Sequence, residues 1–151
     1  MWRRQVPVGF IGSFKHTLDP KGRVFVPKKF LASLPENEPR HFTITRGFEG
    51  CLSLYTAGAW TRTVETMKAK AKGEREIRDF KRMIFAPASQ QPIDLSGRIL
   101  VPEHLRLAAK LTRDVVFVGM DDEIELWDHD TWTRYSDEVS PQFEESGKGV
   151  L

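Results

Sequence analysis

The chain has 151 residues, of which 40% are hydrophobic and 29% charged, and its formal net charge is +2. This composition excludes a disordered chain, which would have fewer apolar residues and a larger net charge. No apolar run reaches the roughly 18 residues of a membrane span, so no membrane partner is expected. The single cysteine, Cys51, excludes an intrachain disulfide and agrees with a cytoplasmic protein.

In chain order, each half of the sequence predicts a strand, a turn, a strand, a short helix, then a strand, a turn, a strand and a helix. The later strands are β-rich runs at residues 42–45 and 51–55 in the first half. In the second half they are residues 115–118 and 124–127. Two short helices, after residues 27 and 102, are expected to pack apolar side chains: Phe30, Leu31 and Leu34 in the first, and Leu105, Leu107 and Ala108 in the second.

Between the halves, residues 57–86 have a helical pattern that Gly73 interrupts, which predicts two helices. Phe80, Met83, Ile84 and Phe85 should bury the apolar side of the second helix, in the lobe or against another subunit. After Tyr135 the chain becomes polar and rich in Gly and Ser, and we expect it to be frayed. Residues 1–9 are expected to be loose.

A nonapeptide occurs twice, as DPKGRVFVP at residues 19–27 and as DLSGRILVP at residues 94–102. Similar segments also surround Trp60 and Trp132. These segments are three positions closer together along the sequence than the two nonapeptides are. The first half therefore has three extra residues, which we place at residues 35–40. The two tryptophans belong to matched apolar patterns, so we expect them to pack rather than to stack on bases.

Each nonapeptide predicts a tight turn, then a strand that a proline ends. Asp19 and Asp94 suit the first position of a turn, where a carboxylate accepts backbone N–H bonds. Gly22 and Gly97 tolerate a left-handed backbone at the fourth position. These four residues are the predicted turn-organising set.

The arginine that follows each turn has two possible roles. Arg23 and Arg98 can pair with the aspartate four residues earlier, or they can point toward a phosphate or a guanine edge. Two copies of the motif, the first one flanked by lysines, favour nucleic acid. The predicted DNA-binding residues are Arg23, Arg98, Lys21, Lys15, Lys28 and Lys29. The second turn has no such lysines along the sequence, so its contact should be weaker or different.

The charge distribution agrees with a polyanionic partner. Residues 1–82 carry 17 Lys and Arg against 8 Asp and Glu, or +9, and residues 83–151 carry 6 against 13, or −7. A solvated basic helix explains this asymmetry about as well as a nucleic-acid interface does. The acidic half of one copy could also attract the basic half of another, which would favour self-assembly.

We find no sequence pattern typical of an enzyme. The four histidines have no metal spacing, and no phosphate-binding glycine loop is present. Cys51 lies in a strand run and is better explained by packing than by nucleophilic chemistry. Asp128, His129 and Asp130 are most simply a strand end that leads into a helix cap. We therefore expect no catalytic residue, no metal, no cofactor and no small-molecule substrate.

The two Asp-x-x-Gly-Arg turns, each followed by x-x-Val-Pro and a short helix, resemble the SpoVT-AbrB fold. Their tandem arrangement, with RDFKRMIFA before the second turn, is similar to the MraZ family of bacterial transcriptional regulators. The resemblance covers about residues 10–135. It implies an α+β fold in which two AbrB-like swapped-hairpin β lobes in tandem form a pseudo-dimeric barrel, with helices linking and following the lobes.

The resemblance also implies a function. Members of the family form rings of several subunits, bind short direct repeats in the promoter of division and cell-wall genes, and associate with the nucleoid. The positions implicated in DNA contact correspond to Asp19, Arg23, Asp94 and Arg98. The implied partners are double-stranded DNA and further copies of the chain. An AbrB-like protein-interaction module, such as an antitoxin that clamps a partner through a flexible tail, is the alternative.

These inferences divide the chain into five segments. They are an N-terminal extension (1–12), a first SpoVT-AbrB-like lobe (13–58), a helical linker (59–87), a second lobe (88–131), and a C-terminal helix with a frayed tail (132–151).

Overall fold

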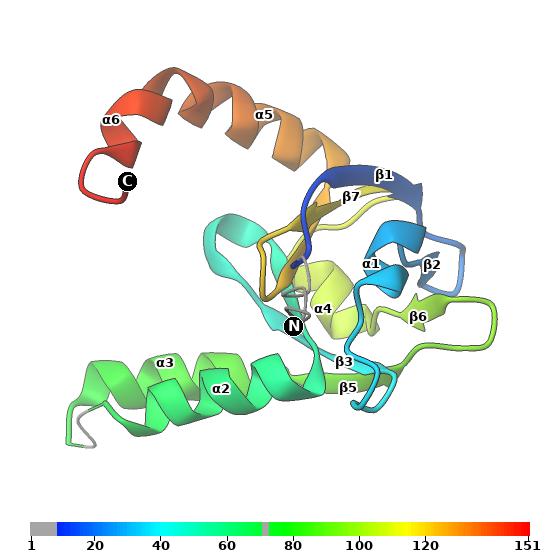
Figure 1. Cartoon of the computed structure of the whole chain (residues 1–151), viewed down its shortest axis with the longest axis horizontal. Coiled ribbons are helices and arrows are strands. Elements are labelled where there is room, and N and C mark those ends of the chain that lie inside the picture. Colours follow the sequence, from blue (N-terminus) through cyan, green and yellow to red (C-terminus); the bar gives the residue numbers. More distant parts are fainter. Residues whose placement is uncertain (1–8, 71–72) are drawn as a thin grey trace, which may run out of the picture.

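The computed structural model describes residues 9–70 and 73–151 as an α+β fold with two antiparallel sheets (Figure 1). The strands are β1 (Ser13–Thr17), β2 (Arg23–Phe25), β3 (His41–Arg46), β4 (Leu52–Tyr55), β5 (Ser89–Pro92), β6 (Arg98–Leu100), β7 (Asp114–Gly119) and β8 (Ile124–Asp128). The α-helices are α1 (Lys28–Ala32), α2 (Ala57–Lys68), α3 (Arg75–Phe85), α4 (Glu103–Ala108), α5 (His129–Val139) and α6 (Phe143–Gly147). Short 3₁₀ turns are η1 (Phe48–Gly50) and η2 (Ser140–Gln142).

The two halves of the chain exchange strands. The large sheet has the order β1-β7-β8-β4-β3-β5, so the first strand of each half pairs with a strand of the other half. In the small sheet, β2 from the first half pairs with β6 from the second. The order of the large sheet reads the same from both ends when equivalent strands are matched, which is the pattern of a pseudo-dimer. The swapped-hairpin α+β fold implied by the sequence is confirmed.

The strand register relocates the extra residues of the first half. Ile44 and Phe117 hold equivalent positions in β3 and β7, since each pairs with the equivalent residue of β5 or β1. Along the sequence, Ile44 and Phe117 are two positions closer together than the two nonapeptides are. Leu54 and Leu126, which pair with Ile44 and Phe117, are closer together by one further position. Two extra residues therefore lie before β3 and one lies in the β3–β4 turn. The prediction that all three lie at residues 35–40 is wrong for one of them.

The core lies between the two sheets and the short helices α1 and α4. Phe30 of α1 and Leu105 of α4 are fully buried, each on the inner side of its helix. Burying one such side chain contributes roughly 1.5–3 kcal/mol. The next inward position is Ala109, the C-cap of α4, four residues after Leu105, because i and i+4 share a helix face. The prediction that Leu107 and Ala108 pack inward is wrong, since Leu107 is 70% exposed and Ala108 is exposed too.

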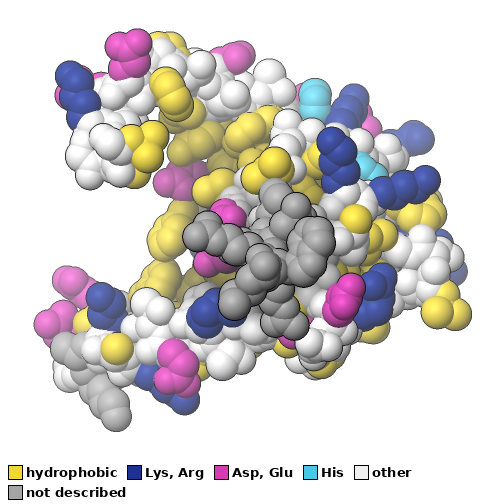
Figure 2. All heavy atoms as spheres, in the orientation of Figure 1, with side chains coloured by type: hydrophobic (Ala, Val, Ile, Leu, Met, Phe, Trp, Pro, Cys, Tyr) yellow, Lys and Arg dark blue, Asp and Glu magenta, His cyan; other side chains and the backbone are white. Residues whose placement is uncertain are grey.

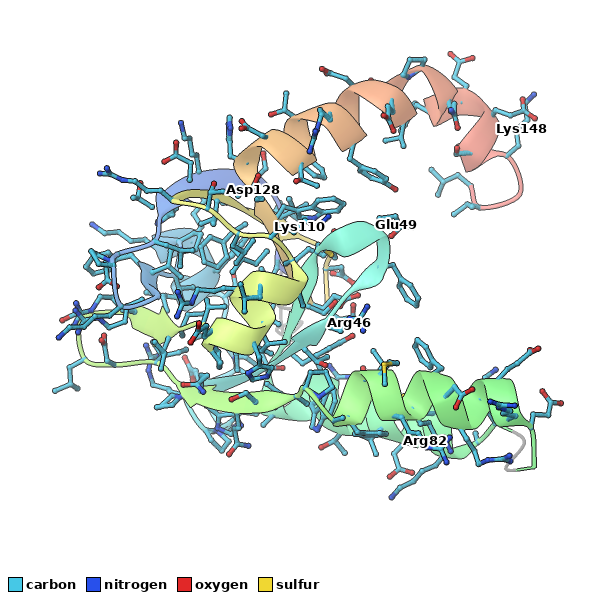
Figure 3. All side chains as sticks on the ribbon, turned by 180° about the vertical axis from the view of Figure 1, so that it is seen from behind. Arg46, Glu49, Arg82, Lys110, Asp128 and Lys148 are labelled. Carbon is cyan, nitrogen blue, oxygen red and sulfur yellow. The ribbon has the colours of Figure 1, made fainter. Side chains whose placement is uncertain are left out.

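Two helical arms leave the same side of the sheet (Figure 1). The lower arm consists of α2 and α3, which separate near Gly73 as the sequence predicted. The upper arm consists of α5, η2 and α6. Glu49 marks the tip of the β3–β4 turn between them (Figure 3). The half-buried rings of Trp60 and Trp132 pack at the bases of the arms, against Tyr55 and Trp127 respectively.

The tail after Tyr135 is helical, so the prediction of a frayed tail is wrong. Helix α5 continues to Val139, and α6 follows after one 3₁₀ turn. Pro141 is the second residue of that turn, where its missing N–H is not needed. Glu144 and Glu145 lie in the first turn of α6, where negative charge is favourable.

At the other end, the expectation of a loose start concerns mainly residues 1–8, which lie outside the described residues. Phe10 is buried in the core, and its backbone exchanges two hydrogen bonds with Asp121. Over residues 9–70 and 73–151, no helix combines the length and the apolarity that crossing a bilayer requires.

Candidate nucleic-acid interface

The first nonapeptide forms a turn whose aspartate binds three N–H groups; we call residues 19–23 turn 1. Oδ1 of Asp19 accepts hydrogen bonds from the backbone N–H of Lys21 and of Arg23, both at 2.9 Å. Oδ2 accepts one from Nε of Arg23 at 2.8 Å. Gly22 has a φ of 85°, which residues with a side chain rarely adopt, and donates to the carbonyl of Asp19.

The second nonapeptide reproduces these bonds; we call residues 94–98 turn 2. Oδ1 of Asp94 accepts from the backbone N–H of Ser96 and of Arg98 at 2.9 Å, and Oδ2 accepts from Nε of Arg98 at 3.0 Å. Gly97 has a φ of 88°. The structure therefore assigns the same geometry to both turns, as the repeated sequence predicted.

Both aspartates are held ionised by the turns they organise. The backbone N–H of Arg23 lowers the pKa of Asp19, and the Arg23 side chain and the Lys21 N–H lower it further. The pKa of Asp94 is lowered in the same way, first by the backbone N–H of Arg98. Hydrogen bonds to a carboxylate favour its charged form. Each arginine is thus tied through Nε to a carboxylate whose charged form is favoured, which limits the directions its guanidinium can take.

Each turn is closed by the other half of the chain. The N–H of Val101, after β6, donates to the carbonyl of Gly22, and the N–H of Val26, after β2, donates to that of Gly97. The pairing of β2 with β6 therefore places α4 against turn 1 and α1 against turn 2. The turns lie at opposite ends of the two-stranded sheet. Four residues along a strand separate them, which at ~3.3 Å per residue gives a distance of about 13 Å.

The two-stranded sheet, which we call the ribbon, has one buried and one outer face. Val24 pairs with Ile99, and both are buried. The alternate positions face outward, where Arg23 lies opposite Leu100 and Phe25 lies opposite Arg98. By this register the two arginines are diagonal neighbours, roughly 7–8 Å apart at Cα.

Neither arginine is buried inside the molecule. The side chain of Arg23 is 37% exposed and that of Arg98 is 29% exposed. The guanidinium of Arg98 also lies 5.8 Å from the ring centroid of Phe25, which is a cation–π distance. Within the described residues, the side-chain hydrogen bonds of both arginines use Nε, and none uses the terminal nitrogens. Local pairing and an outward-facing guanidinium, which the sequence posed as alternatives, therefore occur together.

The predicted lysines are distributed differently in space than along the sequence. Lys21 is exposed within turn 1. Lys28 and Lys29 open α1, which packs on turn 2, so they flank the second turn and not the first. Lys15 lies on β1 in the other sheet, 3.8 Å from the carboxylate of Asp114. The inference that turn 2 lacks neighbouring lysines is corrected by the exchange of strands.

Two arginines that the sequence analysis did not select lie beside turn 1. Nε of Arg106 in α4 donates to the carbonyl of Val101 at 2.9 Å. Arg113 is exposed immediately before β7. A signal for Arg106 was present in the repeat, because alignment of the two nonapeptides places Arg106 opposite Leu31, where an apolar residue would continue the pattern. No sequence signal pointed to Arg113, which only the fold brings to the turn.

The residues weighed for catalysis have structural roles. Cys51 is buried, and this burial raises the pKa of its thiol, so the thiolate is disfavoured. Asp128 caps α5, accepting from the N–H of Thr131, and also accepts two bonds from Thr112. Among residues 9–70 and 73–151, no group of three His, Cys, Asp or Glu side chains is placed to hold a metal ion.

Comparison with known proteins places this geometry in a family context. A family model described as the MraZ protein, suggested to be antitoxin-like, matches the chain twice, at residues 10–83 and 84–148. A relative from Heliobacterium modesticaldum is 39% identical over 142 residues, 94% of this chain and 96% of the relative. One from Caldanaerobacter subterraneus subsp. tengcongensis is 37% identical over 135 residues, 89% of this chain and 92% of the relative. Both relatives carry the name "Transcriptional regulator MraZ".

Proposed function

We propose that this chain, which belongs to the MraZ family of transcriptional regulators, binds promoter DNA through the outer face of its ribbon. The observation that carries the proposal is the position of Arg23 and Arg98 on one face, each anchored by an aspartate. A two-stranded ribbon has a width that the major groove of B-DNA admits. In that groove an anchored guanidinium can read a guanine edge, which is worth roughly 1–3 kcal/mol of discrimination.

The cations around the ribbon would supply affinity without sequence preference. Lys21 in turn 1 and Lys28 and Lys29 beside turn 2 are exposed at the two ends of the ribbon. Lysines at such places contact phosphates and release counterions, which makes binding sensitive to salt. We expect the logarithm of the affinity to fall with the logarithm of the salt concentration, with a slope near −0.9 per neutralised phosphate. A flat salt titration would contradict this use of the lysines.

Self-assembly into a ring is the second part of the proposal. The lower arm, α2 and α3, carries six Lys or Arg against three Asp or Glu, and the upper arm, α5 to α6, carries one against five. The arms of one protomer can therefore attract the opposite arms of its neighbours. Contacts between two different surfaces of identical subunits give a ring when the rotation closes.

Apolar side chains on the arms support this assembly. Phe80, Met83 and Phe85 of α3 and Phe143 of α6 are exposed in the single chain. Hydrophobic side chains line the recess between the two arms (Figure 2). Exposed patches of this kind are typical of protein-interaction surfaces. A neighbouring copy would cover them. For the apolar side of α3, this is the second of the two expectations from the sequence, burial in the lobe or against another subunit.

A ring would present many ribbons to consecutive short repeats, so that individually weak contacts add up through avidity. The direct repeats, the location ahead of division and cell-wall genes, and association with the nucleoid in the cytoplasm are properties that we extend from the family resemblance. A footprint of the protein on the region upstream of its own gene tests them. We expect evenly spaced protected repeats, and a single unrepeated footprint would refute the avidity argument.

The antitoxin alternative draws on the wording of the family model and predicts a bound protein partner. The tail through which such a partner would be clamped is helical in this chain, which favours the DNA-binding proposal. Purification of the tagged protein from its native host separates the two functions. Stoichiometric recovery of a toxin-like protein together with loss of DNA binding would support the alternative.

A further inference from the structure

The two turns differ in the helix residue that covers them, which is Arg106 of α4 at turn 1 and the equivalent Leu31 of α1 at turn 2. A methyl group added at Gly22 would lie 2.7 Å from Nε of Arg106, so the guanidinium of Arg106 covers turn 1. A methyl group added at Gly97 would lie 3.1 Å from Cδ1 of Leu31, so a leucine covers turn 2. Turn 1 is thus backed by a cation, and turn 2 by an apolar side chain.

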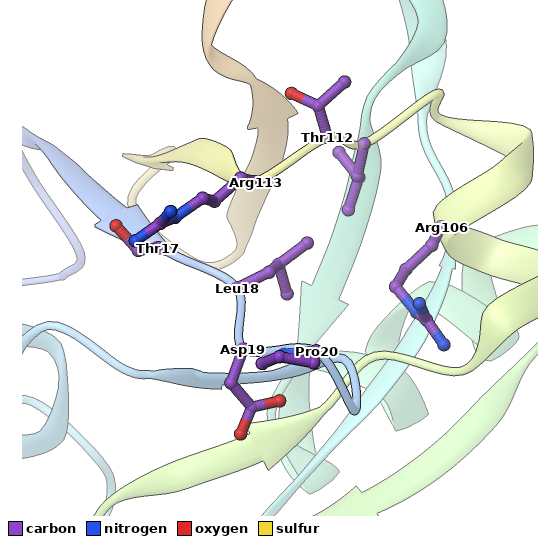
Figure 4. Close-up of a pocket in the computed structure, with 8 residues that line it drawn as sticks. Thr17, Leu18, Asp19, Pro20, Arg106, Thr112 and Arg113 are labelled. Atoms are coloured by element: carbon purple, nitrogen blue, oxygen red, sulfur yellow. The ribbon is translucent and has the colours of Figure 1, made fainter.

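A pocket of about 630 Å³ opens beside turn 1 (Figure 4). Arg106 reaches it from α4 and Arg113 from the loop before β7, on different sides of Leu18 in this view. Thr17 and Thr112 add hydroxyl groups to its lining, Leu18 and Leu111 add apolar surface, and Asp19 adds a carboxylate. The pocket therefore combines two guanidinium groups with hydroxyl groups and an apolar floor.

The electrostatic balance of this pocket is positive. The one carboxylate in its lining, that of Asp19, is already bonded to Arg23 and to two backbone N–H groups. The nearby carboxylate of Asp114 lies 3.8 Å from the ammonium of Lys15. Among the residues that the structure describes, neither Arg106 nor Arg113 makes an ion pair with a carboxylate. Both charges are thus available to an anion that enters from solvent.

We propose that the pocket beside turn 1 binds the phosphodiester backbone of the DNA strand that the ribbon contacts, through Arg106 and Arg113. The inference rests on the proposed function and adds a phosphate-binding site that belongs to one turn only. Guanidinium groups suit phosphate oxygens because their N–H donors match the oxygen geometry. Arg106 is also positioned by its bond to the Val101 carbonyl, so its remaining donors lose little freedom on binding.

The equivalent place beside turn 2 provides a matched control. Arg113 accepts a backbone hydrogen bond from Leu18, and Arg40 accepts the corresponding bond from Ile93. Arg40 is also exposed, but the helix residue that covers turn 2 is Leu31, where turn 1 has Arg106. Truncating Arg40 removes the same charge from a place where the second guanidinium is missing.

The test compares the full-length variants Arg113→Ala, Arg106→Gln and Arg40→Ala with the wild type. Binding to a 30-base-pair duplex of mixed sequence and to a duplex from the upstream region is measured over a range of salt concentrations. For each subunit that contacts the duplex, a pocket variant should weaken binding to both duplexes by roughly eightfold at 0.1 M salt and reduce the salt slope by about 0.9. Arg40→Ala should change the affinity less than twofold.

Melting curves identify any fold defect in Arg106→Gln, and Arg113→Ala removes a side chain that makes no hydrogen bond or ion pair to the other described residues. Unchanged affinity and slope in Arg113→Ala would overturn the inference, and so would an equal loss in Arg40→Ala. These outcomes are distinct from failure of the proposed function, in which the wild type would show no preference for the upstream duplex. Gain of affinity in Leu31→Arg, which copies the arginine to turn 2, would add support.

Discussion

Turn 1 carries Pro20 and Lys21 and lies against Arg106, whereas turn 2 carries Leu95 and Ser96 and lies against Leu31. Inside both turns, the aspartate accepts the same three hydrogen bonds, with almost the same lengths in each turn. The comparison shows that the backbone geometry of the turn depends on few residues, all within five positions. The charge that surrounds the turn depends on residues from elsewhere in the chain, so two identical corners can differ in affinity.

The largest effect is expected when the anchored arginines are removed. Arg23→Ala should abolish binding to the upstream duplex, with a loss above about 100-fold, because its base contact disappears in every subunit of a ring. Arg98→Ala should cost only about tenfold, because its guanidinium is less exposed and lies over Phe25. Gel shifts at fixed salt measure both affinities.

The fold and the assembly should survive either arginine substitution, because an exposed ion pair contributes only ~0–1 kcal/mol to stability. Thermal melting and size-exclusion chromatography supply this control. Unchanged promoter affinity in Arg23→Ala would refute the role of turn 1, and equal losses in the two variants would show that the turns are equivalent.

The next effect is a difference in stability between substitutions of the two turn glycines, Gly22 and Gly97. Both Gly22→Ala and Gly97→Ala force a side chain into the left-handed region, at a cost of roughly 1–2 kcal/mol. In turn 1 the added methyl would also meet the Val101 carbonyl oxygen at 3.0 Å and Arg106 at 2.7 Å, whereas in turn 2 only a leucine methyl must move. We expect about 3 kcal/mol of destabilisation for Gly22→Ala and about 1.5 kcal/mol for Gly97→Ala. Urea denaturation that ranks them in the opposite order would contradict the close packing of Arg106.

A smaller effect should follow from exchanging the third residue of each turn. Lys21→Ser should weaken binding roughly eightfold at 0.1 M salt for each subunit that loses its phosphate contact, and Ser96→Lys should strengthen it by a similar factor. The double variant should bind nearly like the wild type. Measured salt slopes provide the check: if neither single variant changes the slope, the third residue of each turn does not contact phosphate.

The smallest effect concerns pH and should be the same in both turns. The folded-state pKa of Asp19 and of Asp94 is lowered, so each carboxylate stabilises the fold above its unfolded pKa of ~3.9. This contribution is lost as the pH falls through the lower folded-state pKa. Asp19→Asn and Asp94→Asn should therefore lower the melting temperature at pH 7, and the difference from wild type should vanish in strong acid. A different pH profile for the two variants would break the equivalence of the turns.

Much of the fold could be predicted because the repeat supplies the same local signals twice. The strand, turn and helix order of each half, the helix break near Gly73 and the cap at Asp128 all depend on neighbouring residues. The wrong predictions for Leu107 and for one of the three extra residues depended on distant contacts or on one-residue offsets, whereas the tail after Tyr135 is helical through local signals such as Glu144 and Glu145. Leu107 looked like part of an apolar run, but the direction of α4 buries Leu105 and Ala109 instead.

The sequence by itself determined the inner geometry of the two turns, since each aspartate accepts its three hydrogen bonds from groups within five positions. Only the tertiary structure decided which side chains surround each turn. The strand exchange pairs β2 with β6, and this non-local pairing carries Lys28 and Lys29 to turn 2 and Arg106 and Arg113 to turn 1. Such pairing is set by the burial of Val24 and Ile99 against a core built from both halves, which no stretch of local sequence specifies.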